Sequence, residues 1–135
     1  MTLTVPAATE NVITFGGYDN VTNAFYPKSG RGFTRENRIK PDLTAPAVNV
    51  YGPGISGGYT RRTGTSVACA LGAGACAQIL QWGIVEDNEP YMKNNYIKNY
   101  LIRGAERNRD IRYPSEQWGY GTINVFDSFL ILTRT

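Results

Sequence analysis

Histidine is absent from this chain of 135 residues. Without an imidazole the chain can form neither a Cys/His zinc site nor a Cys–His nucleophile pair. Cysteine is scarce as well, with only Cys69 and Cys76, seven positions apart on one predicted helix. That spacing separates them by about 10 Å along the helix axis, which is too far for a disulfide. We expect both to be buried free thiols that pack as small apolar side chains.

Charge is also limited, at 19% of residues and a net charge of +3, beside a hydrophobic content of 41%. These values and the length are typical of one globular domain with its own core. Two clusters contain most of the basic residues: Lys28, Arg31, Arg35, Arg38 and Lys40, and then Arg103, Arg107, Arg109 and Arg112. Acidic and polar residues alternate with them, which favours a solvated surface over a nucleic-acid interface.

No signal peptide is predicted, because Met1–Pro6 leads directly into strand-like sequence, and the compartment stays undetermined.

Sixteen uncharged residues, most of them small and apolar, follow Gly64-Thr65-Ser66 up to Trp82. Small apolar residues on every side predict a helix over residues 65–82 that is buried rather than amphipathic. Its length and its Gly and Ala content argue against a membrane span. Thr65 or Ser66 is expected to cap the helix, at the positive end of the helix dipole. Such a hydroxyl is either a plain N-cap or part of a site that stabilises an oxyanion.

The remaining segments predict alternating strands and helices. Strands are expected at Val12–Phe15 and Asp42–Tyr51, and a surface hairpin at Gly52–Gly57. The hairpin segment has the form G-x-G-x-x-G, but no helix follows it and no acidic residue lies about twenty positions on, so a dinucleotide site is rejected.

Helix signals occupy the second half of the chain. Gly83 is expected to end the central helix, and Glu89-Pro90 to begin a second helix that ends near Gly104. Tyr96, Ile97, Tyr100 and Leu101 form its apolar stripe, which we interpret as core. Asn124 and Asp127 predict the start of a final short helix. The order of elements predicts an α/β fold with a mainly parallel sheet and a buried central helix.

Four motifs, in order, carry a family resemblance. Gly64-Thr-Ser-Val-Ala68 resembles the sequence around the nucleophile of subtilisin-like serine proteases, and Arg38–Val50 resembles the strand that precedes it in that family. Asn11–Asp19 resembles an earlier strand, and Trp118–Val125 a closing turn. The resemblance covers nearly the whole chain and implies that residues 1–135 are the C-terminal portion of a subtilisin-like peptidase domain, which is incomplete here.

The resemblance implies that Ser66 is the nucleophile of peptide-bond hydrolysis and that Thr65 supports the oxyanion side. The family's Asp, His and oxyanion Asn lie upstream of the matched part, so the isolated chain is predicted to be inactive. After Ala68 the family usually has Ser or Thr, then Pro and His, where this chain has Cys69, Ala70 and Leu71. Without the proline the first turn is less constrained, and a shift of Ser66 by about 1 Å is enough to lower the rate a hundredfold.

Three interpretations stay open: part of a subtilisin-like endopeptidase, a pseudoprotease that keeps the fold for binding or regulation, or a truncated product that self-associates. The expected partners are a polypeptide substrate after assembly, and the N-terminal half of the domain or a second copy, which would cover an open strand edge and an apolar sheet face. Neither a nucleic acid nor a membrane is expected as a partner. No cofactor is predicted, and the resemblance leaves a calcium site of the family's type open.

Overall fold

Strand β1 (Phe15–Asp19) is the central strand of a three-stranded sheet in the computed structural model, which describes residues 2–134. Strand β3 (Leu43–Pro46) pairs with it in parallel, from Phe15 opposite Leu43 to Tyr18 opposite Pro46, and the short strand β2 (Ala24–Phe25) pairs antiparallel on its other side. The α/β prediction is therefore confirmed. The bounds predicted for the first strand, Val12–Phe15, are wrong, because β1 begins at Phe15 and continues through Gly16 and Gly17. Gly17 permits this continuation, since a Cβ there would lie 2.6 Å from the Cβ of Ala47.

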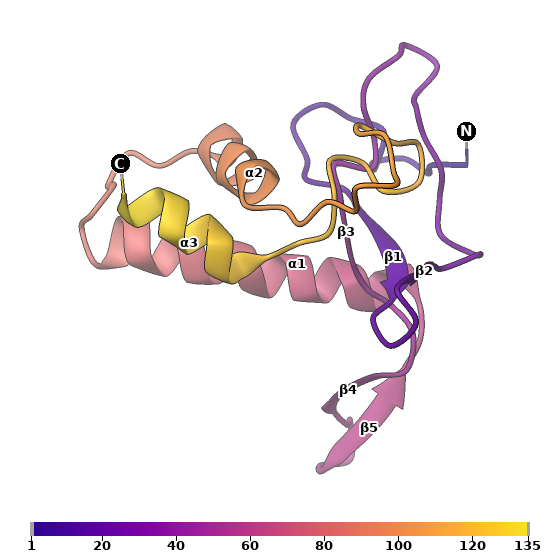
Figure 1. Ribbon diagram of the computed structural model, residues 1–135. Coiled ribbons are helices and arrows are strands. Elements are labelled where there is room, and N and C mark those ends of the chain that lie inside the picture. The colour runs from indigo at the N-terminus through magenta and orange to yellow at the C-terminus, as the bar shows by residue number, and fades with distance from the viewer. Residues whose placement is uncertain (1, 135) are drawn as a thin grey trace.

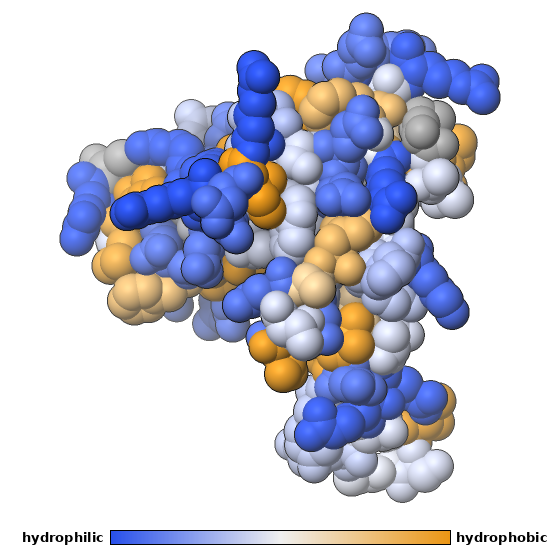
Figure 2. All heavy atoms as spheres, turned by 45° about the vertical axis from the view of Figure 1, so that its right-hand side comes forward, coloured by the Kyte–Doolittle hydropathy of each residue, from blue (hydrophilic) through white to orange (hydrophobic). Residues whose placement is uncertain are grey.

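The predicted strand over residues 42–51 is divided into two. β3 ends at Pro46, Asn49 has a positive φ of 50°, and the chain then enters a hairpin of β4 (Val50–Pro53) and β5 (Tyr59–Arg62). This confirms the hairpin predicted at Gly52–Gly57. The hairpin extends away from the rest of the molecule and forms a separate lobe (Figures 1 and 2).

Helix α1 (Thr65–Leu80) forms where the uncharged stretch predicts a helix, but it is not buried all round. Its buried residues are Ala68, Gly72, Ala75 and Ile79, which form one stripe at helical spacing against β1 and β3. The opposite flank is exposed, and Leu71 there is 41% accessible. In Figure 1, α2 and α3 lie on one side of α1, and along most of its length no helix covers the other side among residues 2–134. The same exposure makes the prediction of a buried Cys69 wrong, whereas Cys76 is half-buried and both thiols are free.

Gly83 does not end the central helix. The helix continues through a π-helical turn, η1 (Gln81–Val85), in which Gly83 is buried against Met92. A Cβ on Gly83 would lie 2.7 Å from the Met92 Cε, so the glycine is required by close packing and not by a helix cap. By length and mean hydropathy (1.4), Thr65–Val85 is sufficient to cross a membrane, which corrects the prediction that it is too short. Core helices of soluble proteins share that property, so it is weak support for a span.

Two shorter helices pack together beside α1. Helix α2 (Asn94–Arg103) begins four residues later than Pro90, and its predicted end near Gly104 is confirmed. Ile97 and Leu101 are buried as predicted, but Tyr96 is half-exposed. Helix α3 (Val125–Thr133) begins as predicted, because the Asn124 side chain accepts a hydrogen bond of 3.0 Å from the Asp127 backbone N–H. Its Phe129 ring packs edge-on against Trp82 at 6.4 Å, which fixes α3 against η1.

A buried ionic cluster connects the N-terminal segment, the residues just before β3, and α2. Asp42 is fully buried, and its Oδ2 accepts hydrogen bonds of 2.7 Å from both the Thr14 backbone N–H and the Lys40 ammonium. Lys40 also donates to the Val12 carbonyl at 2.6 Å, and the Lys98 ammonium on α2 lies 2.5 Å from Asp42 Oδ1. Burial lowers the pKa of Lys40, an effect that the charge of Asp42 opposes. Removing Asp42 would leave the buried Lys40 ammonium without a compensating charge, whereas Asp42 without Lys40 would still be paired with Lys98.

Candidate nucleophile site

Ser66 lies in the first turn of α1 and is exposed. The residue before the helix, Gly64, has a φ of +152°, at the edge of the range that side-chain-bearing residues rarely adopt. Its backbone N–H donates to the Ala47 carbonyl at 2.7 Å, and its own carbonyl accepts from the Val67 N–H at 3.0 Å. The turn is therefore tied to the end of β3 on one side and to the helix on the other. This arrangement fixes the start of α1, and with it Ser66, relative to the end of β3.

The predicted side-chain cap is wrong. Gly64 is the N-cap residue, and no side chain among residues 2–134 makes a capping hydrogen bond to α1. Thr65 is the first helical residue, and its methyl group packs toward β1, where a Cβ on Gly17 would lie 3.4 Å from it. Because the Ser66 hydroxyl is not used as a cap, it stays available for other chemistry at the positive end of the helix dipole. The role of Thr65 on the oxyanion side stays a prediction.

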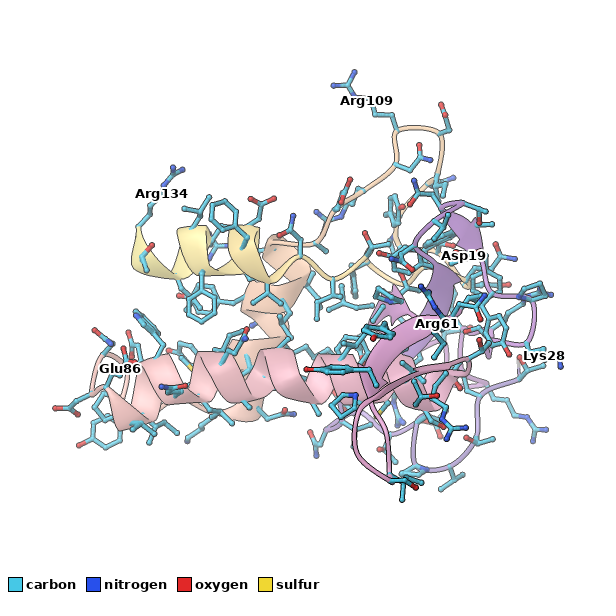
Figure 3. The ribbon with its side chains drawn as sticks, turned by 90° about the horizontal axis from the view of Figure 1, so that it is seen from below. Asp19, Lys28, Arg61, Glu86, Arg109 and Arg134 are labelled. Carbon is cyan, nitrogen blue, oxygen red and sulfur yellow. The ribbon has the colours of Figure 1, made fainter. Side chains whose placement is uncertain are left out.

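The hairpin before Ser66 has an aromatic and cationic surface. The Tyr51 and Tyr59 rings stack with centroids 5.1 Å apart and planes 15° apart. The Arg61 guanidinium lies 5.7 Å from the Tyr51 ring centroid and donates to the Asn49 carbonyl at 3.1 Å. Figure 3 shows Arg61 among the hairpin side chains near the start of α1. The hydroxyl of Thr63 accepts from the Asn49 backbone N–H at 2.9 Å and so closes the base of the hairpin.

The imidazole that accepts the serine proton in a Ser-His-Asp triad is not present in this chain. Imidazole is absent, and residues 43–85 contain no Asp or Glu. Asp42, which immediately precedes this segment, is fully buried and paired with two lysines. Within residues 2–134, no group of three His, Cys, Asp or Glu side chains is arranged to hold a metal ion. Ser66 is thus placed at a helix start in a chain that contains no imidazole to accept its proton.

The exposed flank of α1 is continuous with a shallow groove of about 330 Å³. It lies between the helix and the segment before β1 and is lined mainly by apolar and small side chains, among them Val12, Ile13, Phe15, Cys69, Ala73 and Cys76. Burial raises the pKa of the Cys76 thiol. The groove was not foreseen from the sequence, because the composition of α1 is equally apolar on all sides.

Comparisons with known proteins agree with this arrangement. A sequence model described as "Subtilase family" matches residues 1–121. Membrane-bound transcription factor site-1 protease of Mus musculus is 30% identical over 98% of this chain, and serine protease AprX of Bacillus subtilis is 27% identical over 94%. The structure of the Clostridium perfringens CspB protease superposes with a TM-score of 0.94 at 38% identity over 99% of this chain.

The chain spans only part of these proteins: 12% of the site-1 protease, 31% of AprX and 29% of the CspB protease chain. The family match nevertheless includes the strand β1, the strand β3, the hairpin and the whole of α1 with Ser66. The structural superposition extends to nearly every residue. This chain therefore belongs to the subtilase family.

Proposed function

We propose that this chain is the nucleophile-bearing C-terminal part of a subtilisin-like serine endopeptidase domain, with Ser66 as the nucleophile. The observation that carries the proposal is the exposed Ser66 hydroxyl in the first turn of α1, at a turn fixed by Gly64. Peptide hydrolysis needs a serine that is accessible to the scissile carbonyl and held in one geometry. Its backbone surroundings meet both conditions.

The chain's own residues hold Ser66 in place and provide a positive electrostatic environment beside it. Unpaired N–H groups at the start of α1 and the helix dipole favour negative charge beside Ser66, as an oxyanion requires. The hydrogen bond from Gly64 to Ala47 couples the nucleophile turn to β3. Proton removal from Ser66 requires a base from another polypeptide segment, since a serine hydroxyl is a weak nucleophile at neutral pH. The isolated chain is therefore proposed to be inactive.

The N-terminal half of the same domain is the proposed partner. Two features support it: the exposed apolar flank of α1, and the outer edge of β1, where β2 pairs only with Tyr18 and Asp19. Apolar faces and open strand edges favour association. Part of the β1 edge is already satisfied, because Gly17 accepts from the Tyr26 N–H at 3.1 Å and donates to the Ser29 hydroxyl at 2.9 Å. We therefore propose that the partner covers the exposed flank of α1, and self-association through this flank is the competing outcome.

Labelling by a fluorophosphonate probe tests the nucleophile. The chain is incubated with the probe alone, and after mixing with the upstream part of the CspB protease domain, which is expected to supply the Asp and His. Light scattering is used to establish whether a complex forms. We expect labelling only in the complex. The Ser66→Ala complex should not be labelled, whereas the matched control Ser56→Ala, which alters an exposed hairpin serine, should be labelled like the unmodified chain.

Each other outcome contradicts a defined part of the proposal. Rapid labelling of the isolated chain would contradict the need for an external base. Labelling of the complex that survives Ser66→Ala would contradict the nucleophile assignment. A complex that forms but is never labelled would contradict catalysis and favour the pseudoprotease. Stable homodimers that exclude the upstream part would contradict the proposed partner.

A further inference from the structure

A second concave site lies away from α1, between the end of β1 and the loop before the closing turn. It is a cavity of about 220 Å³, with three aromatic rings, one carboxylate and two amides in its lining: Tyr18, Tyr113, Trp118, Glu106, Asn23 and Asn108. Cavities that take drug-sized ligands are larger, at about 300–1,000 Å³. The size therefore suits a single functional group, such as the end of one side chain or a small amine.

The aromatic walls are held in place by their neighbours. The Tyr18 and Trp118 rings lie with centroids 5.9 Å apart and planes 49° apart, and Phe25 packs edge-on against Trp118, also at 5.9 Å. Trp118 is only 9% exposed. The Tyr113 hydroxyl accepts from the Asn108 backbone N–H at 3.2 Å, which fixes the third ring to the same loop. The cavity is thus formed before any ligand binds.

Glu106 places a carboxylate at this cavity without a cationic partner. Its backbone is fixed by paired hydrogen bonds with Thr122, of 2.9 and 3.0 Å. None of the ion pairs among residues 2–134 involves Glu106. Burial raises the pKa of Tyr18, and the negative charge of Glu106 raises it further, as expected for a carboxylate close to that ring.

The nearby arginines do not neutralise Glu106. Arg107 donates to the Ile102 carbonyl at 2.6 Å and to the Ala105 carbonyl at 3.4 Å, so its guanidinium is used at the end of α2. Arg109 lies at the tip of the loop and points away from the molecule (Figure 3). Neither lines the cavity. An unpaired carboxylate beside aromatic rings is therefore left for a ligand.

We propose that this cavity binds an organic cation: the ammonium or guanidinium group of a basic side chain, or of a small free amine. Cations are attracted to the faces of Trp and Tyr rings, and a carboxylate adds a charge-assisted hydrogen bond. The side-chain amides of Asn23 and Asn108 add neutral groups whose oxygens can accept hydrogen bonds from the cation. The proposal is independent of the role of Ser66, because no residue of the nucleophile segment lines the cavity.

The test uses two-dimensional amide NMR of the 135-residue chain during titration with n-butylammonium chloride. The two tryptophans give an internal control, since the Trp118 indole lies at the cavity and the Trp82 indole packs against α3. We expect saturable shifts of the Trp118 indole and of the Asn23 and Thr122 amides, with the Trp82 indole unchanged. n-Butanol, which has a similar stem without charge, should bind roughly fivefold more weakly.

Variants and a peptide complete the experiment. Glu106→Gln should weaken n-butylammonium binding roughly threefold to fivefold, whereas Glu116→Gln, a matched change on an exposed residue of the same loop, should leave it unchanged. An extended peptide with one central Lys is compared with the same peptide carrying Gln. Tighter binding of the Lys peptide than of n-butylammonium assigns the cavity to a polypeptide side chain, and the reverse order assigns it to a free amine. Equal responses to n-butylammonium and n-butanol, or unchanged binding in Glu106→Gln, would overturn the proposal.

Discussion

Two glycines of α1 should respond to alanine in opposite directions. An ideal Cβ on Gly72 would lie 2.2 Å from Cε2 of Phe15, whereas a Cβ on Gly74 meets nothing within 4 Å. Carbon atoms pack at about 3.5–4.0 Å, so in Gly72→Ala the ring must move by more than about 1 Å. Phe15 contacts both apolar clusters of the core and has little room to move. Such overpacking costs about 1–3 kcal/mol.

Alanine gains about 1 kcal/mol over glycine within a helix, and this gain is common to both variants. The difference in unfolding free energy between them therefore reports the clash, and we expect Gly74→Ala to be the more stable by about 1–3 kcal/mol. Urea unfolding at one fixed protein concentration measures this difference, which corresponds to a midpoint shift on the order of 1 M. If Gly72→Ala unfolds at the same or a higher urea concentration than Gly74→Ala, the packing of α1 on Phe15 is wrong.

The buried ion cluster and the two thiols give further expectations. Asp42→Ala should lower the unfolding free energy by about 3–5 kcal/mol, because it leaves the buried Lys40 ammonium without its carboxylate, and combining it with Lys40→Met should recover part of that loss in urea unfolding. A loss below about 1 kcal/mol would show that the pair is hydrated. At pH 7 an aromatic disulfide reagent should modify the exposed Cys69 roughly tenfold faster than Cys76, whose pKa is raised by burial. Cys69→Ser should remove the fast phase, and equal rates would contradict the observed burial.

Local sequence was sufficient to predict several elements. The charge-free stretch predicted α1, Asn124 and Asp127 predicted the start of α3, and the Gly and Pro residues at 52–57 predicted the hairpin. In each case the signal comes from residues close in sequence: small apolar side chains, a side chain that accepts from a nearby backbone N–H, or turn-forming residues. The four motifs likewise predicted the subtilase family.

Element boundaries needed the tertiary structure. Gly83 is a helix-ending signal in the sequence, yet it is a contact point for Met92, nine residues away. Gly16 and Gly17 directly follow the strand predicted at Val12–Phe15, yet they belong to β1 and let it pass close to its neighbours. A glycine is compatible both with a turn and with close approach of another segment, and only the partner's position distinguishes the two.

The sequence by itself determined that Ser66 stands at a helix start and that the chain supplies no imidazole, since both depend on residue type and short-range order. The fold decided which flank of α1 is buried. The apolar residues of α1 are distributed on every side of the helix, and only packing against β1 and β3 determines which of them are covered. The cavity at Glu106 was likewise decided by the fold. Its walls come from β1, the loop after it and a segment nearly ninety residues later, and no local pattern can specify a juxtaposition over that separation.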